Sequence, residues 1–133
     1  MTGELLADVD EVLFRQIHPS FLDNGKPSSQ PFAPTAKDQD KLSVDRSSLT
    51  DAASSFALFT GAGHQSVGVY GLTVGEFGAE LIPCLSDPLP AVGAEPANPA
   101  HAYADFSGHG PSRQKAKAKR LKQKALARGR LHP

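Results

Sequence analysis

The two signs of charge are separated along this chain of 133 residues, and the separation limits what the chain can fold into. Residues 111–133 hold nine of the 14 Lys and Arg residues and none of the 14 Asp and Glu residues. Such a segment offers little to a hydrophobic core, because burying unpaired charge is costly. We therefore expect an acidic domain over residues 1–110, with long Pro-rich loops, and a basic helical arm over residues 111–133.

The composition predicts a small core. Only 39% of the residues are hydrophobic, and 11 Pro and 12 Gly interrupt regular structure. The single cysteine, Cys84, excludes an intramolecular disulfide and favours a reducing compartment. The N-terminal residues lack a signal-peptide pattern, and no apolar run approaches the ~20 residues of a membrane span. We expect one small cytoplasmic protein of a bacterial-like cell, without a membrane partner, that a binding partner helps to stabilise.

Four segments have the composition of strands, namely Glu11–His18, Lys41–Asp45, Ser66–Thr73 and His101–Ser107. The first and third are apolar on both faces, which predicts an inner strand and a central strand. Arg15 lies on a mostly buried face of the first, so it should have an acidic partner or a ligand. In the third, Gly68 and Gly71 let another segment approach the backbone closely.

Helix signals separate these strands. Ser48 or Thr50 can cap a helix that runs to about Thr60, and Thr73 with Glu76 has the spacing of a capping box that opens a short helix. Residues 83–99 contain five prolines, which predicts irregular structure. The fold class is therefore α+β, with a small mixed or antiparallel sheet of about four strands, two short helices and a C-terminal basic helix. The first helix could be a crossover that makes its flanking strands parallel.

The basic segment predicts a helix from about Ser112 to Arg128 that ends at Gly129. Its apolar stripe of Ala118, Leu121 and Ala125 is narrow, so we expect weak docking and a mainly electrostatic role. Three partners are possible: an acidic protein surface, nucleic-acid phosphates, or the chain's own acidic body, which would compete with the other two. The tail lacks aromatic residues, which excludes base stacking. The expected contacts are Arg113, Lys115, Lys117, Lys119, Arg120, Lys122, Lys124 and Arg128.

The long segment over residues 19–40 contains four prolines and two phenylalanines, Phe21 and Phe32. Aromatic side chains in a proline-constrained loop are typical of a binding surface. The alternative is that this loop simply covers a small core. We include Phe21 and Phe32 among the expected binding residues.

An enzymatic alternative comes from the order of Arg15, Ser28-Ser29 and Glu76, which resembles ADP-ribosyltransferases. In that family the arginine holds the dinucleotide, the serine supports the site and the glutamate aligns the ribose. The resemblance implies a small nucleotide-using enzyme with Arg15, Ser29, Tyr70 and Glu76 around a cleft. It covers only these positions, and the family's characteristic surroundings of the glutamate are missing.

Other catalytic or metal patterns are absent from the sequence. His101 and His109 are the only close pair of histidines, with Asp105 midway; His101 and Asp105 would share a strand face but lie about 13 Å apart, too far for one ion unless the strand bends. Cys84 has no neighbouring base. We expect no metal and no cofactor, and the leading hypothesis is a non-catalytic accessory protein that binds an acidic partner within a complex.

Overall fold

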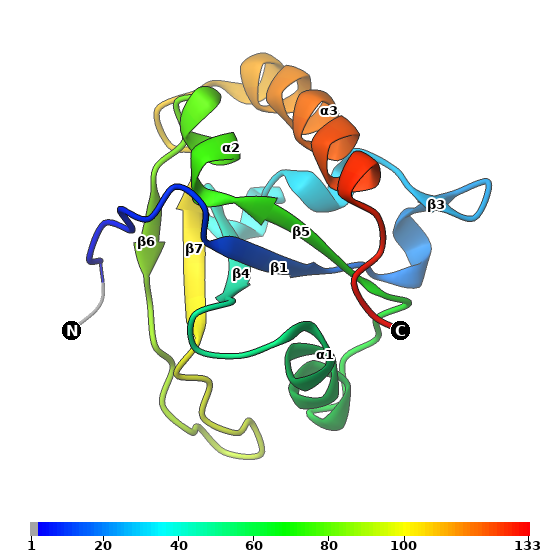
Figure 1. Cartoon of the computed structure of the whole chain (residues 1–133), viewed down its shortest axis with the longest axis vertical. Helices are drawn as coiled ribbons and strands as arrows, with labels where there is room; N and C mark the ends of the chain where they lie inside the picture. Colours follow the sequence, from blue (N-terminus) through cyan, green and yellow to red (C-terminus); the bar gives the residue numbers. More distant parts are fainter. Residues whose placement is uncertain (1–2) are drawn as a thin grey trace.

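The computed structural model describes residues 3–133 and shows an α+β fold built on a five-stranded antiparallel sheet (Figure 1). The strand order is β5-β1-β4-β7-β6, and β2 and β3 form a separate hairpin. The strands are β1 (Val12–Gln16), β2 (Leu22–Asp23), β3 (Lys26–Pro27), β4 (Lys41–Arg46), β5 (Val69–Thr73), β6 (Cys84–Ser86) and β7 (His101–Asp105). The four predicted strands are present as β1, β4, β5 and β7. Strands β2, β3 and β6 are additions, and prolines on both sides concealed β6.

Strand β5 was expected to be central, and this was wrong: it is the edge strand beside β1. The C-terminal segment covers its outer edge, where Val69 N–H donates to His132 O at 2.7 Å and Leu131 N–H donates to Val69 O at 2.8 Å. A Cβ on Gly71 would lie 2.7 Å from Leu131 Cδ1, and one on Gly68 would lie 2.7 Å from Arg130 Cδ. The predicted close approach at these two glycines is therefore confirmed, and the approaching segment is the chain's own end.

Strands β4 and β5 run parallel to each other, as the crossover reading expected, because both pair antiparallel with β1; they share no hydrogen bonds, since β1 lies between them. The predicted inner position of β1 is confirmed. The helices are α1 (Ala52–Gly61), α2 (Val74–Ala79) and α3 (Pro111–Arg128), with 3-10 turns at Pro19–Phe21, Gln30–Phe32 and Ala36–Asp38. Within residues 3–133, no helix is both long enough and apolar enough to cross a membrane.

The helix ends follow local side-chain chemistry. Helix α2 begins at the predicted capping box, with Thr73 Oγ1 accepting from Glu76 N–H at 3.0 Å and Glu76 Oε1 accepting from Thr73 N–H at 2.8 Å. Helix α1 is capped by Asp51 rather than by Ser48 or Thr50. Ser48 instead donates to the carboxylate of Glu11.

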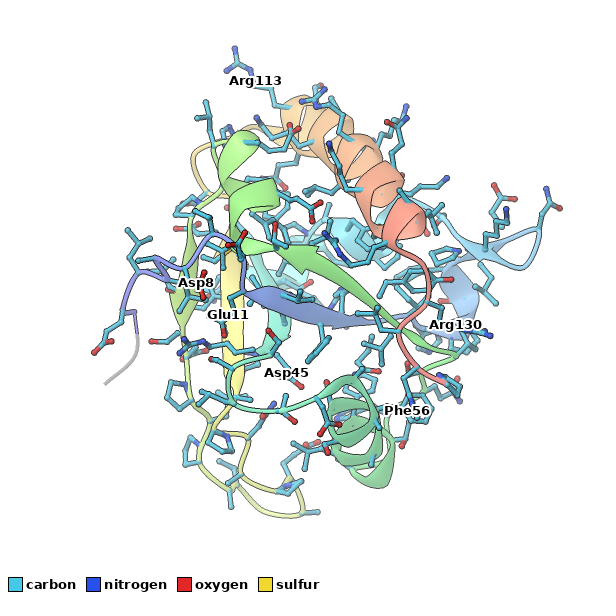
Figure 2. The ribbon with its side chains drawn as sticks, in the orientation of Figure 1. Asp8, Glu11, Asp45, Phe56, Arg113 and Arg130 are labelled. Carbon is cyan, nitrogen blue, oxygen red and sulfur yellow. The ribbon has the colours of Figure 1, made fainter. Side chains whose placement is uncertain are left out.

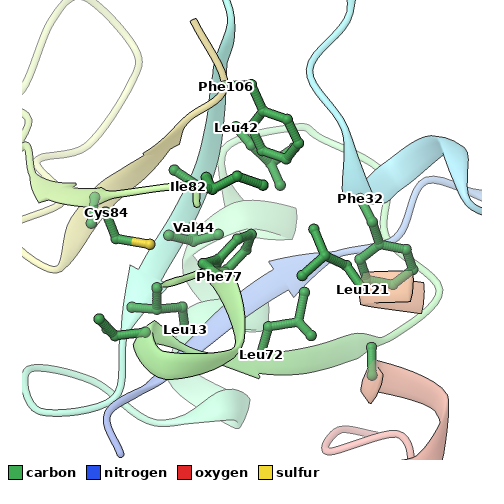
Figure 3. Close-up of a cluster of buried hydrophobic side chains, with 14 of the residues drawn as sticks. Leu13, Phe32, Leu42, Val44, Leu72, Phe77, Ile82, Cys84, Phe106 and Leu121 are labelled. Carbon is green, nitrogen blue, oxygen red and sulfur yellow. The ribbon is translucent and has the colours of Figure 1, made fainter. Parts of the chain in front are cut away.

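One face of the sheet carries the hydrophobic core. Leu13 from β1, Leu72 from β5, and Leu42 and Val44 from β4 pack there with Phe77 of α2. Helices α2 and α3 cover this face (Figure 1), and Figure 3 shows Leu121 of α3 beside Phe32. The same cluster includes Ala118 and Ala125 of α3, which are 2% and 0% exposed.

The opposite face of the sheet is covered less completely. Helix α1 contacts β1, yet Ser55 is its only buried residue in the described chain. The residues 87–99, drawn in yellow-green below the sheet in Figure 1, extend along the same side. An antiparallel sheet tolerates such a difference because its two faces alternate in sequence. This second face holds the pocket described below.

Candidate functional site

Helix α3 lies against the body instead of projecting from it. Its small buried side chains, Ala118 and Ala125, allow close approach around Leu121. We expected the narrow stripe to dock weakly; in the structure the stripe is buried, and its small residues bring α3 close to an apolar surface. The C-terminal end of the predicted helix is confirmed, with Gly129 at φ 91.

Polar contacts fix the side of α3 that faces α2. Lys117 Nζ donates to Glu80 O at 2.6 Å, and Arg120 Nε donates to both carboxylate oxygens of Glu80 at 2.8 and 3.0 Å. The hydrogen bond from Arg120 is the main reason that the pKa of Glu80 lies below its usual value. Two of the expected binding cations are therefore already occupied within the chain.

A second ion pair holds the end of α3. Arg128 donates to Glu76 Oε1 at 2.8 Å and Oε2 at 3.1 Å, and also to Gly71 O at 2.8 Å. Burial alone would raise the pKa of Glu76, but hydrogen bonds from Arg128 and Thr73 outweigh it and hold that pKa low. Glu76 thus joins the start of α2 to the end of α3.

The remaining cations of α3 are exposed to solvent, except Lys122, which is half-buried. Lys115, Lys119 and Lys122 follow each other by four and three residues, so they share one side of the helix. We call these three residues the lysine row. Across residues 3–133, no carboxylate pairs with Arg113, Lys124 or any member of the row. Figure 2 shows Arg113 extending away from the body at the start of α3.

The two phenylalanines of the long loop have different environments. Phe32, expected to be a binding anchor, is 0% exposed and belongs to the core, because its 3-10 turn packs under α3. Phe21 is half-buried and meets the His18 ring edge-on at 6.1 Å. Of the two phenylalanines, Phe32 therefore covers the core, and Phe21 stays partly accessible for contact.

The residues of the enzymatic alternative each take part in contacts of the fold. Arg15 Nε donates to Pro31 O at 2.6 Å and its Nη1 donates to Ser43 O at 3.2 Å. Burial lowers the pKa of Arg15 to about 10, and the charge of Asp38 opposes that shift, so the expected acidic neighbour is present. Tyr70 lies opposite Arg15 in the sheet and packs against the core.

Ser29 precedes the Gln30–Phe32 turn, and its side chain forms no capping hydrogen bond. The carboxylate of Glu76 is held by Arg128 and by Thr73 N–H. Among the described residues, no hydrogen bond or ion pair joins the Arg15 and Glu76 side chains. Catalytic use of Arg15 or Glu76 would require release of the hydrogen bonds that hold these two side chains.

A pocket of about 440 Å³ lies on the second face of the sheet. Strands β1, β4 and β7 form its floor, where Phe14, Asp45 and His101 lie side by side in register. Leu58 and Phe59 of α1 form one wall, and residues of the 87–99 segment form another. Its size and mixed apolar and polar lining are typical of small-molecule sites. Figure 2 shows the Asp45 side chain on the α1 side of the sheet.

Hydrogen bonds organise the polar side chains of this pocket. Asp45 accepts from Ser55 Oγ at 2.7 Å and from Asn98 Nδ2 at 2.9 Å. Gln16 donates to Ser55 Oγ at 2.9 Å and accepts from Ser66 Oγ at 2.8 Å. The network links the sheet to α1 and to the 87–99 segment, so the pocket is held open by structure on three sides.

The histidines are distributed singly. His101 Nδ1 lies 2.9 Å from Asp87 O, and His64 Nε2 lies 2.9 Å from Glu95 Oε1 at the pocket. In residues 3–133, no three His, Cys, Asp or Glu side chains gather in a way that could hold a metal ion. Burial raises the pKa of the Cys84 thiol to about 12, so this cysteine is an unreactive core residue.

Sequence reasoning missed the pocket. The sequence did contain a sign of it: Gln16, Asp45 and His101 alternate with core residues along their strands. That these three residues lie on one common face, however, depends on the strand order, which the sequence did not predict.

Comparisons with known proteins add no further identification: no protein-family model, no curated protein and no solved structure matches this chain.

Proposed function

We propose that this protein is a non-catalytic binding protein of the cytoplasm that engages an acidic partner, within a protein complex or on nucleic acid, through helix α3. The proposal is supported by one observation: α3 is docked through its apolar stripe and its α2-facing cations, while the lysine row stays solvent-exposed or half-exposed without an acidic partner. In this proposal α3 presents a fixed basic surface to the partner.

A fixed surface has an energetic advantage over a mobile arm. When a helix becomes ordered only on binding, the free energy of ordering it weakens the affinity. A helix that is already docked was ordered during folding, so binding does not include that cost. The lysine row extends over two turns, and flexible lysine side chains suit phosphates or carboxylates as point charges. In this proposal Lys117, Arg120 and Arg128 stabilise the fold, and the lysine row contacts the partner.

Salt-dependent binding tests this proposal. The probes are a 20-base-pair DNA duplex and poly-L-glutamate, titrated against the full chain between 50 and 200 mM NaCl (about the range over which counterion release is large). The test variant is Lys115→Gln with Lys119→Gln. The matched control is Lys26→Gln with Lys37→Gln, which removes the same charge from exposed sites outside α3.

The unaltered chain should bind at least one probe at low salt. In the test variant, the slope of log affinity against log salt should fall by about one per lysine removed for the duplex. The control pair should keep most of the slope. Failure of both probes to bind, or an equal loss in the control pair, would remove the support for α3 as the contact surface.

A further inference from the structure

The pocket between the sheet, α1 and residues 87–99 has no role in the proposed function of α3, and its chemistry indicates a ligand of its own. We propose that it binds a small planar nitrogen compound, neutral or cationic, that carries adjacent N–H donors, such as an amidine or an amino-substituted heterocycle. The proposal does not depend on the activity of α3, which lies on the other face of the sheet.

The floor of the pocket is rich in hydrogen-bond acceptors. Asp45 and His101 are direct cross-strand partners in β4 and β7, which places their Cβ atoms about 5 Å apart. Each oxygen of Asp45 accepts one hydrogen bond from the protein, and a carboxylate oxygen has capacity for a second. A ligand with two neighbouring N–H groups therefore matches this pair.

The tautomer of His101 is fixed by its neighbour. Its Nδ1 lies 2.9 Å from Asp87 O and 3.2 Å from Asp87 Oδ2, and both oxygens only accept, so Nδ1 carries a proton. In the neutral ring, Nε2 is then an acceptor. Asn98 uses its amide nitrogen on Asp45, which leaves its oxygen as another acceptor. The polar lining thus requires donors from the ligand.

The carboxylates of the pocket disfavour anions. Asp45 and Glu95 line it together with one arginine, Arg15, whose Nε and Nη1 already donate to the carbonyls of Pro31 and Ser43. A phosphate or carboxylate ligand would meet two carboxylates against this single, already engaged guanidinium. The apolar part of the ligand has aromatic and aliphatic surfaces to stack on, at Phe14, Leu58 and Phe59.

The rim is closed by a pair of side chains from different segments. His64 Nε2 lies 2.9 Å from Glu95 Oε1, and the His64 ring stacks on Phe59 with centroids 4.8 Å apart. Both side chains are about half exposed, so the pair can open without breaking the core. When this contact opens, a ligand of single-ring size can enter the pocket beside α1.

The test uses three single-ring probes of matched shape: benzamidine, benzamide and benzoate, titrated into the full chain at pH 7 and followed by amide chemical shifts. Benzamidine should bind most tightly and benzoate at least tenfold more weakly, with shifts concentrated in β4, β7 and α1. Asp45→Asn should weaken benzamidine at least tenfold and change benzamide less than threefold. Asp23→Asn, which removes the same charge in the separate β2–β3 hairpin, should change neither.

A second variant guards against misfolding of Asp45→Asn, since Asp45 also holds Ser55 and Asn98. Ser43→Phe keeps those contacts and fills the pocket floor, so it should abolish benzamidine binding while the fold is retained. The proposal is overturned if none of the probes binds, if benzoate binds as tightly as benzamidine, if the shifts lie outside the pocket, or if Ser43→Phe binds normally.

Discussion

Glu11 and Arg46 form a two-point ion pair at the start of β1, with Arg46 Nε donating to Glu11 Oε2 and Nη2 donating to Oε1, both at 3.1 Å. The Glu11 side chain is only 4% exposed, and Ser48 adds hydrogen bonds from its backbone N–H and its hydroxyl. The pair ties the entry of the inner strand to the end of β4. The pair therefore holds the start of β1 beside the end of β4.

The first prediction concerns this pair. Glu11→Gln should lower the free energy of unfolding at pH 7 by ~3 kcal/mol, because Arg46 and Ser48 lose a charged acceptor in a largely buried site. Urea denaturation measures this loss. Glu4→Gln, an exposed change of the same kind, should alter stability by less than about 0.5 kcal/mol.

The pair also predicts a pH dependence. Burial would raise the pKa of Glu11, but the hydrogen bonds from Arg46 and Ser48 and the charge of Arg46 hold it below the usual 4.5. A lowered carboxyl pKa stabilises the fold above the unfolded value and loses that effect as pH falls through the folded value. The difference between the unaltered chain and Glu11→Gln should thus shrink below pH 4.5; a constant difference would contradict this assignment.

The second prediction tests whether α3 belongs to the core. Leu121 is 1% exposed, so Leu121→Ala should cost about 2–5 kcal/mol in urea or thermal denaturation. Leu126, on the same helix but only partly buried, is the control, and Leu126→Ala should cost clearly less. Equal effects of the two substitutions would mean that α3 does not dock through Leu121.

The third prediction concerns the approach of the chain's end to β5. Gly71→Ala places a Cβ 2.7 Å from both Leu131 Cδ1 and Val12 Cγ1, which should cost about 1–3 kcal/mol. Adding Leu131→Ala should recover part of the loss. Gly78→Ala, in α2 with open space around the added Cβ, should instead be neutral or stabilising. Failure of Leu131→Ala to recover any stability would argue against this contact.

The fourth prediction concerns Cys84. Because burial raises the pKa of its thiol to about 12, the native protein should react with a thiol-specific disulfide reagent at pH 8 only as fast as it unfolds. Reaction should be complete in 6 M guanidinium chloride, the control condition (about the strength that unfolds most domains). Rapid reaction of the native protein would show that Cys84 is accessible.

Local signals predicted most of the secondary structure, while placement in the sheet depended on long-range contacts. The capping box at Thr73, the end of α3 at Gly129 and the alternation in β7 act within a few residues, so they were visible in the sequence. Strand β5 packs on the core through Leu72, and the C-terminal segment lies along its edge with Leu131 against Gly71. Both faces can therefore be apolar, and this made an edge strand resemble a central one. Strand β6 has three residues, too few for a periodic signal.

The basic residues of α3 were recognised as a group, but their division was not predictable. Glu80 pairs with Lys117 and Arg120, and Glu76 pairs with Arg128. These pairs form only when α2 and α3 pack together, so they depend on the tertiary fold. Phe32 and Phe21 carry the same loop signal, and packing under α3 separates them. The pocket was not predicted from the sequence for the same reason, since the residues described as lining it come from strands, a helix and a loop that are distant along the chain.

The most direct test of the central claim maps a bound polyanion onto α3 by amide chemical shifts of the full chain at low salt, with the DNA duplex and poly-L-glutamate as separate probes. The account predicts that the largest shifts fall on Lys115, Lys119 and Lys122, that they vanish at high salt, and that the cations paired with Glu76 and Glu80 shift little. Binding that spares the lysine row, or that appears only at the Arg120 and Arg128 positions, would contradict it.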